Sequence, residues 1–149
     1  PEQHYSIPVC NAQHCFVGTE VQKKIWRNIV LNFDLVDRLK EAVESLKPPG
    51  GKPYVCLHAR VERDFEVYFQ SSPRFKRANE IVDMLLRHPM PAGMDTLYIA
   101  GGSTSAIASM IRSHPSNKFR TILSHEQSAR IQGMSALEKS LVDLFVCQD

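Results

Sequence analysis

The chain has 149 residues, and its 18 lysines and arginines against 16 aspartates and glutamates give a formal net charge of +2. Apolar residues make up 43% of the chain, which suits one globular domain with a buried core and excludes a disordered polypeptide. The small net charge gives no reason to expect nucleic acid or an anionic membrane as a partner. No apolar run is long enough to span a bilayer, so no membrane contact is expected within this segment.

The first stretch, residues 1–18, shows no sustained periodicity and is interpreted as a connection from a preceding N-terminal part. The chain opens on Pro1, with no signal-peptide pattern, and we expect a fragment of a longer protein. Residues 19–149 are expected to form a single domain that is truncated at its C-terminal end.

The four cysteines divide into two pairs of different character. Cys10 and Cys15 are five residues apart and lack the second pair of ligands that a zinc site needs, so no metal is expected. These two cysteines can form a disulfide if the compartment is oxidising. Cys56 and Cys147 stand in apolar runs and are interpreted as small core residues.

Two helices are predicted ahead of the first clear strand. One runs from Thr19 to about Asn32 and contains Trp26, which is interpreted as a packing residue. The second is capped by Asp34 and ends at the Pro-Pro-Gly-Gly turn of residues 48–51. Its predicted apolar face consists of Leu35, Val36, Leu39, Ala42, Val43 and Leu46.

A short apolar strand, Tyr54–Ala59, then runs directly into a dense group of ionisable residues. Alternation along an extended backbone places four of them on one side and Arg63 on the other. Ligands bind beyond the carboxyl ends of parallel strands, and an arginine fork suits phosphate, so a ligand site is predicted here. A surface network of ion pairs is the alternative. The four residues on one side are His58, Arg60, Glu62 and Asp64.

A helix capped by Ser72 follows, with Phe75, Ala78, Ile81, Val82, Leu85 and Leu86 on its apolar face. Thr96–Ala100 is the next predicted strand, and the segment Gly101-Gly102-Ser103-Thr104-Ser105 leads from it into another helix. A glycine pair and hydroxyls before a helix can present backbone amides to an anion. A tight turn with a capping serine is the alternative. The apolar face of this helix is predicted to be Ala106, Ile107, Met110 and Ile111.

The last part of the chain contains a predicted strand, Phe119–Leu123, a polar segment with a short helix after Ser124, and a final helix from Ser135. Asp143 lies off the apolar face of this last helix, one turn from Lys139, and a surface Lys–Asp pair is the plain interpretation. Strands that alternate with helices in this way predict an α/β fold with a Rossmann-like parallel sheet and flanking helices. The face predicted to be buried is Leu137, Leu141, Leu144 and Phe145.

Three stretches in this order resemble the GDP-fucose-dependent fucosyltransferases, which include the protein O-fucosyltransferases and the plant O-fucosyltransferase-like group. The first is the H-x-R-x-E-x-D pattern from His58 to Asp64, and the second is the Tyr98-Ile99-Ala100 strand. The third, Ser135 to Gln148, is similar to the family's segment A-L-x-x-x-x-V-D-x-F-x-x-x-D. The resemblance reaches from about Trp26 to Asp149 and is closest to the plant-type and algal form.

The resemblance implies transfer of fucose from GDP-fucose to a hydroxyl of a protein or glycan acceptor, with inversion. Arg60 would hold the β-phosphate and help the leaving group to depart, and His58 would contact the nucleotide. Asp143 would hydrogen bond the guanine. Glu62 and Asp64 would orient Arg60 or contact the sugar, and Gly101, Gly102 and Ser103 would offer backbone contacts where several relatives carry a polar Thr-Asp pair. No D-x-D pattern occurs, so we expect a metal-independent reaction with no cofactor besides the donor GDP-fucose.

The family's architecture is the two-domain GT-B fold, of which this chain would cover mainly the nucleotide-sugar half. The N-terminal domain with its acceptor contacts, and the Ser/Thr-rich motif expected just after Asp149, would lie outside it. A eukaryotic host would imply the Golgi or endoplasmic reticulum, and a bacterial host the cytoplasm. Two alternatives stay open: a catalytically inactive GDP-sugar-binding or scaffold protein, and another Rossmann-like nucleotide-binding enzyme.

Overall fold

The structure is a computed structural model, and it describes residues 5–7, 37–59, 61, 67, 77–90 and 92–148. Several predicted features lie outside these residues. They are the first helix with Trp26, the pair Cys10 and Cys15, the caps Asp34 and Ser72, Phe75, and the charged residues Arg60, Glu62, Arg63 and Asp64.

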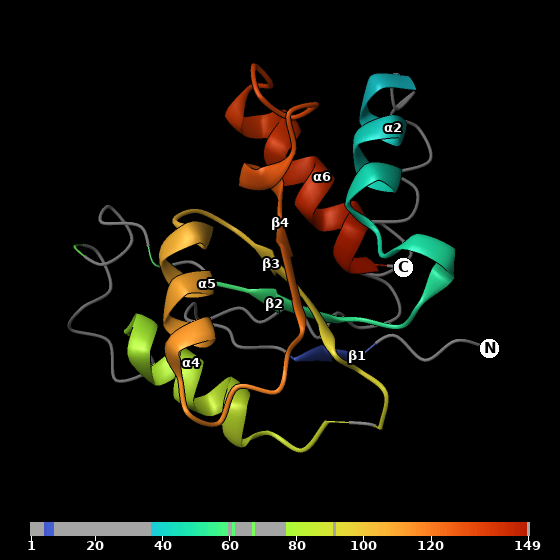
Figure 1. The fold of residues 1–149 in the computed structure, drawn as a ribbon. Helices are drawn as coiled ribbons and strands as arrows, with labels where there is room; N and C mark the ends of the chain where they lie inside the picture. Colours follow the sequence, from blue (N-terminus) through green and yellow to red (C-terminus); the bar gives the residue numbers. More distant parts are fainter. Residues whose placement is uncertain are drawn as a thin grey trace, which may run out of the picture.

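Four parallel strands form one sheet in the order β1-β2-β3-β4 (Figure 1). Their bounds are Tyr5–Ile7 for β1, Val55–His58 for β2, Thr96–Ala100 for β3 and Thr121–Ser124 for β4. The α/β class and the Rossmann-like parallel sheet predicted from the alternating pattern are confirmed. The last strand begins two residues later than predicted, at Thr121, and the N–H groups of Arg120 and Thr121 both donate to the carbonyl of Asp95.

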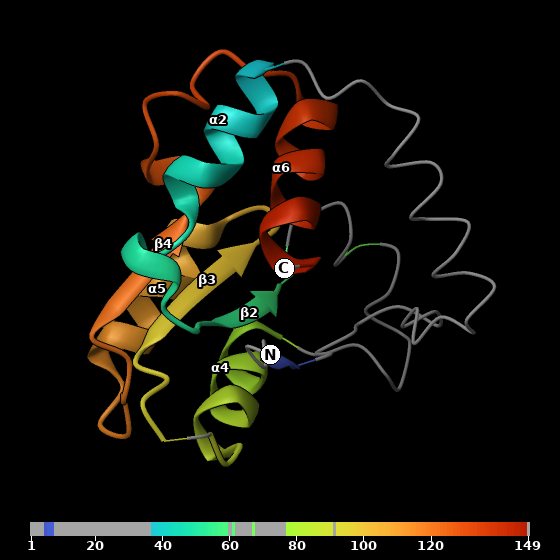
Figure 2. The same cartoon turned by 90° about the vertical axis from the view of Figure 1, so that its right-hand side faces the viewer.

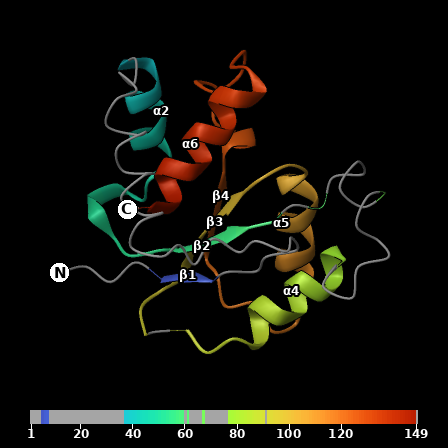
Figure 3. The ribbon, with the colours of Figure 1, turned by 180° about the vertical axis from the view of Figure 1, so that it is seen from behind.

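Helices cover both faces of this sheet. Helices α4 (Ala78–Arg87) and α5 (Thr104–Ser113) lie against one face, and α2 (Asp37–Leu46) and α6 (Ala136–Gln148) lie against the other (Figures 2 and 3). Two short 3-10 turns, η1 (Pro49–Gly51) and η2 (His125–Gln127), complete the described elements. The connections β2–α4–β3 and β3–α5–β4 step across the sheet in the same direction, so crossovers of one hand place both helices on one face.

Strand alternation divides the core into two clusters. Val55, Leu57, Leu97 and Ile99 point toward α4 and α5 and form a hydrophobic cluster with them. Tyr54, Cys56, Tyr98 and Ala100 point the other way, toward α2 and α6. Within the described residues, no helix combines the length and the apolar character that crossing a membrane requires.

The predicted faces of α2 and α4 are confirmed at most of the described positions, although Ala78 is only partly buried, and the faces of α5 and α6 are partly wrong. Leu35 and Val36 lie outside the described residues. Leu39, Ala42, Val43 and Leu46 are buried on α2, and Ile81, Val82, Leu85 and Leu86 are buried on α4. On α5, Ile107 and Ile111 are buried as predicted, whereas Ala106 and Met110 are exposed and Ala108 takes their place.

The buried face of α6 was predicted incorrectly. Leu137 is 70% exposed, Leu141, Leu144 and Phe145 are only partly buried, and the fully buried positions are Val142 and Val146. The helix is rotated relative to the prediction because Asp143, beside Val142, also turns inward to hydrogen bond with the sheet. A pattern of apolar residues alone cannot anticipate a buried carboxylate.

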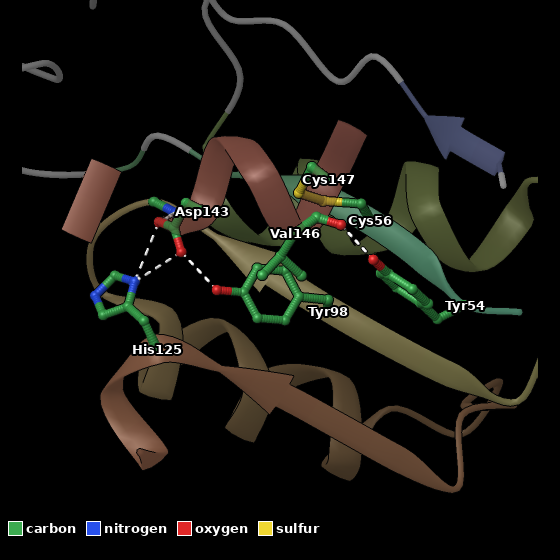
Figure 4. Close-up of a disulfide and its surroundings, with 8 residues drawn as sticks. Tyr54, Cys56, Tyr98, His125, Asp143, Val146 and Cys147 are labelled. Carbon is green, nitrogen blue, oxygen red and sulfur yellow. Dashed lines mark hydrogen bonds and ion pairs between the residues drawn. A yellow bond between two sulfur atoms is a disulfide. The ribbon is translucent and has the colours of Figure 1, made fainter. Parts of the chain in front are cut away.

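Cys56 is buried in the core and Cys147 packs against the same cluster, as predicted, but the sequence did not indicate that the two are paired. They form a disulfide between β2 and the last turn of α6, with their Cα atoms 5.5 Å apart (Figure 4). Beside it, the Tyr54 hydroxyl donates a hydrogen bond to the carbonyl of Val146. Val146 and Cys147 of α6 are therefore tied to Tyr54, just before β2, and to Cys56 within it.

Candidate functional site

A pocket of about 450 Å³ opens at the carboxyl edge of the sheet. His58 is the last residue of β2, Gly101 and Gly102 directly follow β3, and His125 directly follows β4. Helix α6 closes one side. Because parallel strands end at one edge, these segments meet although they are far apart in sequence. The lining residues are His58, Gly101, Gly102, His125, Ala136, Lys139, Ser140, Asp143 and Leu144.

Four predicted site residues, His58, Gly101, Gly102 and Asp143, line this pocket together. Ser103 is not among the lining residues; it is exposed and has a left-handed backbone with φ of 55°. Arg60, Glu62 and Asp64 lie outside the described residues, so their predicted roles stay predictions.

Asp143 is the centre of a buried hydrogen-bond cluster (Figure 4). The Tyr98 hydroxyl donates to Asp143 Oδ1 at 2.6 Å, and the Gly101 N–H donates to Oδ2 at 2.8 Å. His125 Nδ1 lies 2.9 Å from Oδ1 and 3.1 Å from Oδ2. The plain interpretation of a surface pair with Lys139 is therefore wrong, because three donors from the sheet side surround a carboxylate that is only 6% exposed. A contact between Asp143 and guanine stays a prediction.

His125 is a pocket residue that the sequence analysis did not select. An ionised carboxylate only accepts hydrogen bonds, so we assign a proton to His125 Nδ1, which leaves Nε2 on the opposite side of the ring. The hydrogen bond to Asp143 raises the pKa of His125 above 6.5, although partial burial works against this. Its position could have indicated a site residue, because His125 directly follows a strand and lies at the same edge of the sheet as His58.

Tyr98 serves as a fixed donor in this cluster. Its ring is fully buried, and burial followed by the negative charge of Asp143 raises its pKa far above the ordinary value of 10.0. The phenol therefore keeps its proton at any physiological pH, and its role is to hold Asp143 in place.

Gly101 is required by the geometry between β2 and β3. Its φ is +113°, and a Cβ atom there would collide with the carbonyl oxygen of Ala59. Ala59 in turn donates its N–H to the carbonyl of Ala100 at 2.9 Å. A larger residue at position 101 would push apart the strand ends that carry His58 and the pocket, as well as the N–H that bonds Asp143.

The start of α5 is bonded to a carboxylate of the protein itself. The Ser105 N–H donates to Glu126 at 2.9 Å. Partial burial works to raise the pKa of Glu126, but hydrogen bonds from the first residues of α5 prevail and lower it. Backbone amides from Gly101 to Ser105 were predicted to bind an external anion. Two of them, those of Gly101 and Ser105, already donate to carboxylates of the protein.

The pocket combines Lys139, two histidines and one carboxylate that is already hydrogen bonded, so it offers donors to a ligand rich in acceptors. Within the described part of the chain, no group of three or more His, Cys, Asp and Glu residues could hold a metal ion. Comparisons of the chain with protein-family models, curated proteins and solved structures find no match.

Proposed function

We propose that this chain is the nucleotide-sugar half of a GT-B glycosyltransferase that transfers fucose from GDP-fucose to a protein or glycan hydroxyl. One observation carries the proposal: His58, Gly101, Gly102 and Asp143, selected from separate stretches of the sequence, line one pocket at the carboxyl edge of a parallel sheet. Its volume of about 450 Å³ lies in the range of small-molecule sites.

In the proposed reaction, the bond between fucose C1 and the β-phosphate oxygen breaks, and GDP leaves with the electron pair. The acceptor hydroxyl oxygen bonds C1 from the opposite face, and a base on the acceptor side takes its proton. Negative charge builds on the β-phosphate, so a fixed arginine beside it lowers the barrier. Arg60, two residues after His58, is proposed for this role, with Glu62 and Asp64 orienting it or touching the sugar.

Calorimetry of GDP binding to the full chain tests the proposal. Arg60→Ala should weaken GDP binding about tenfold or more, the effect of losing a charged hydrogen bond. Arg63→Ala removes the same charge from the predicted opposite side of the extended segment and should leave GDP affinity nearly unchanged. UDP should bind more weakly than GDP to the wild type.

Two results would contradict the proposal. If Arg60→Ala leaves GDP affinity unchanged, Arg60 does not contact the phosphate, and the proposed reaction loses the group that stabilises its leaving group. Equal or tighter binding of UDP or ADP would point to another Rossmann-like nucleotide enzyme. If GDP-fucose binds, release of GDP from it should fall by about 10²–10³ in Arg60→Ala, the usual effect of removing a preorganised donor. Binding without any release, with acceptors supplied, would favour a GDP-sugar-binding scaffold.

A further inference from the structure

Around His125, the carboxylates have hydrogen-bond partners within the protein, whereas the donor groups left for a ligand have none within the part of the chain that the structure describes. Asp143 and Lys139 approach it from α6, Glu126 from η2, and His58 lines the same pocket from β2. Asp143 is enclosed by its three donors, and Glu126 is bonded to Ser105. Among the described residues, neither Lys139 Nζ nor His125 Nε2 has a hydrogen-bond or ion-pair partner. The groups left to meet a ligand are therefore cationic or hydrogen-bond donors.

The orientation of His125 is fixed by the buried cluster. Its Nδ1 is held by Asp143, Asp143 is held by Tyr98 and Gly101, and the ring is only 12% exposed. Figure 4 shows the second ring nitrogen on the side away from Asp143. A ring held in this way loses little further freedom when it binds a ligand, which favours affinity.

We propose that His125 Nε2 and Lys139 Nζ form a phosphate-binding subsite in this pocket, and that Asp143 is a positioning residue that holds the imidazole. The subsite deepens the proposed function, because it would take a phosphate of the nucleotide sugar in addition to the contact assigned to Arg60. Both residues line one pocket, and an anion bound there would compensate an imidazolium and an ammonium group together.

Protonation of His125 links this subsite to pH. The imidazolium presents an N–H at Nε2 to a phosphate oxygen, whereas the neutral ring, with its proton on Nδ1, presents a lone pair that repels it. Phosphate binding should therefore weaken as pH rises past 6.5 through the raised pKa of His125. Lys139 lowers that pKa, so Lys139→Gln should weaken binding and move the pH midpoint upward.

The test is calorimetry of GDP, pyrophosphate and guanosine over about pH 6 to 9, the range around a shifted histidine. At the acid end, His125→Gln should weaken the binding of GDP and pyrophosphate about tenfold or more. The affinity of the variant should also lack the decline with rising pH that His125 causes in the wild type. Guanosine, which has no phosphate, should be unaffected. Comparison with the variant cancels the titration of the ligand's own phosphates.

His114→Gln is the matched control, because His114 Nε2 lies 3.3 Å from Asp83 Oδ1 in another imidazole–carboxylate pair that does not line the pocket. It should leave the pH profile unchanged. For the positioning role, Asp143→Asn should move the midpoint to lower pH. Because this variant can fail to fold, NMR of His125 in the wild type provides a second measurement: added pyrophosphate should shift the Nε2 resonance more than Nδ1.

The outcomes separate this subsite from the proposed function. GDP binding that depends on Arg60 but is identical in His125→Gln at every pH would overturn the subsite and leave the fucosyltransferase proposal standing. Pyrophosphate binding that needs His125, with no preference for GDP over UDP, would support the subsite and overturn the proposed donor. An equal loss of guanosine affinity in His125→Gln would assign the contact to the base and overturn the subsite.

Discussion

The face of the sheet under α4 and α5 is held by apolar contacts, whereas the face under α2 and α6 adds a disulfide, two tyrosine hydrogen bonds and a buried carboxylate. The same strands supply both, since Leu57 and Ile99 point one way and Cys56 and Tyr98 the other. The pocket is built on the polar side. Local patterning predicts most of the buried residues under α4 and α5, with Ala108 of α5 as an exception, whereas the pocket depends on partners distant in sequence.

The largest expected effect concerns the Cys56–Cys147 disulfide. Its closed loop spans 91 residues, for which the chain-entropy treatment gives about 4–5 kcal/mol of stability. Cys147→Ala, or addition of a reductant to the wild type, should lower the free energy of unfolding by this order in urea titrations. The double variant Cys10→Ala/Cys15→Ala should keep its sensitivity to reductant. A wild type that is equally stable with and without reductant would contradict the pairing.

Leu85→Ala tests the apolar face. Leu85 is fully buried between α4 and the sheet, so its truncation should destabilise the protein by about 2–5 kcal/mol. This loss should not change with pH or with reductant, unlike losses on the other face. Met84→Ala, one residue away and 48% exposed, is the control and should change stability by less than about 0.5 kcal/mol.

Tyr98→Phe removes one hydroxyl from the polar face while keeping the ring. Its bond to the Asp143 carboxylate is buried, so unfolding free energy should fall by about 1.5–3 kcal/mol in urea titrations. Tyr54→Phe removes a hydroxyl that donates to a neutral carbonyl and should have the smaller effect, about 0.5–1.5 kcal/mol. The reverse order would contradict a stronger contribution from the Tyr98 hydroxyl than from the Tyr54 hydroxyl.

His125 should make stability depend on pH. Its pKa is higher in the folded protein, so its contribution is fully present below pH 6.5 and is lost as pH rises through the folded pKa. Urea titrations across this range should show declining stability in the wild type and a flatter profile in His125→Gln. Parallel profiles for the two proteins would mean that the Asp143 hydrogen bond does not favour the imidazolium.

The smallest effect is expected at Leu137, where sequence and structure disagree. The sequence placed it on the buried face of α6, which would predict a loss of several kcal/mol on substitution. It is 70% exposed, so Leu137→Ser should change unfolding free energy by less than about 0.5 kcal/mol. Val142→Ala, at a fully buried position on the same helix, should be clearly more destabilising.

The parts of this fold that were predictable are those governed by local rules. The short apolar runs of β2 and β3 indicate strands that are buried on both faces, and the three- and four-residue spacing in α2 and α4 indicates one buried helix face. In α6 the apolar spacing predicted the wrong buried face, because Asp143 turns inward to donors that lie 18, 42 and 45 residues away in the sequence.

The site was recoverable only in part for the same reason. His58, Gly101 and Gly102 stand at strand ends, where the rule for parallel sheets points to ligands. His125 obeys the same rule but sits in a short polar segment without a motif, and its significance comes from Asp143. The disulfide was not predicted because free core cysteines and disulfide-bonded cysteines both occur in apolar stretches of sequence.

The Cys56–Cys147 bond has a consequence for the order of events during synthesis. At about 5–20 residues per second, the thiol of Cys56 waits on the order of 5–20 s until Cys147 has been made. Cys10 and Cys15 precede both in the chain, so each is available to Cys56 earlier. Cys56 can pair with Cys147 only after nearly the whole chain has been made, and any earlier bond to Cys10 or Cys15 would first have to be released by thiol exchange.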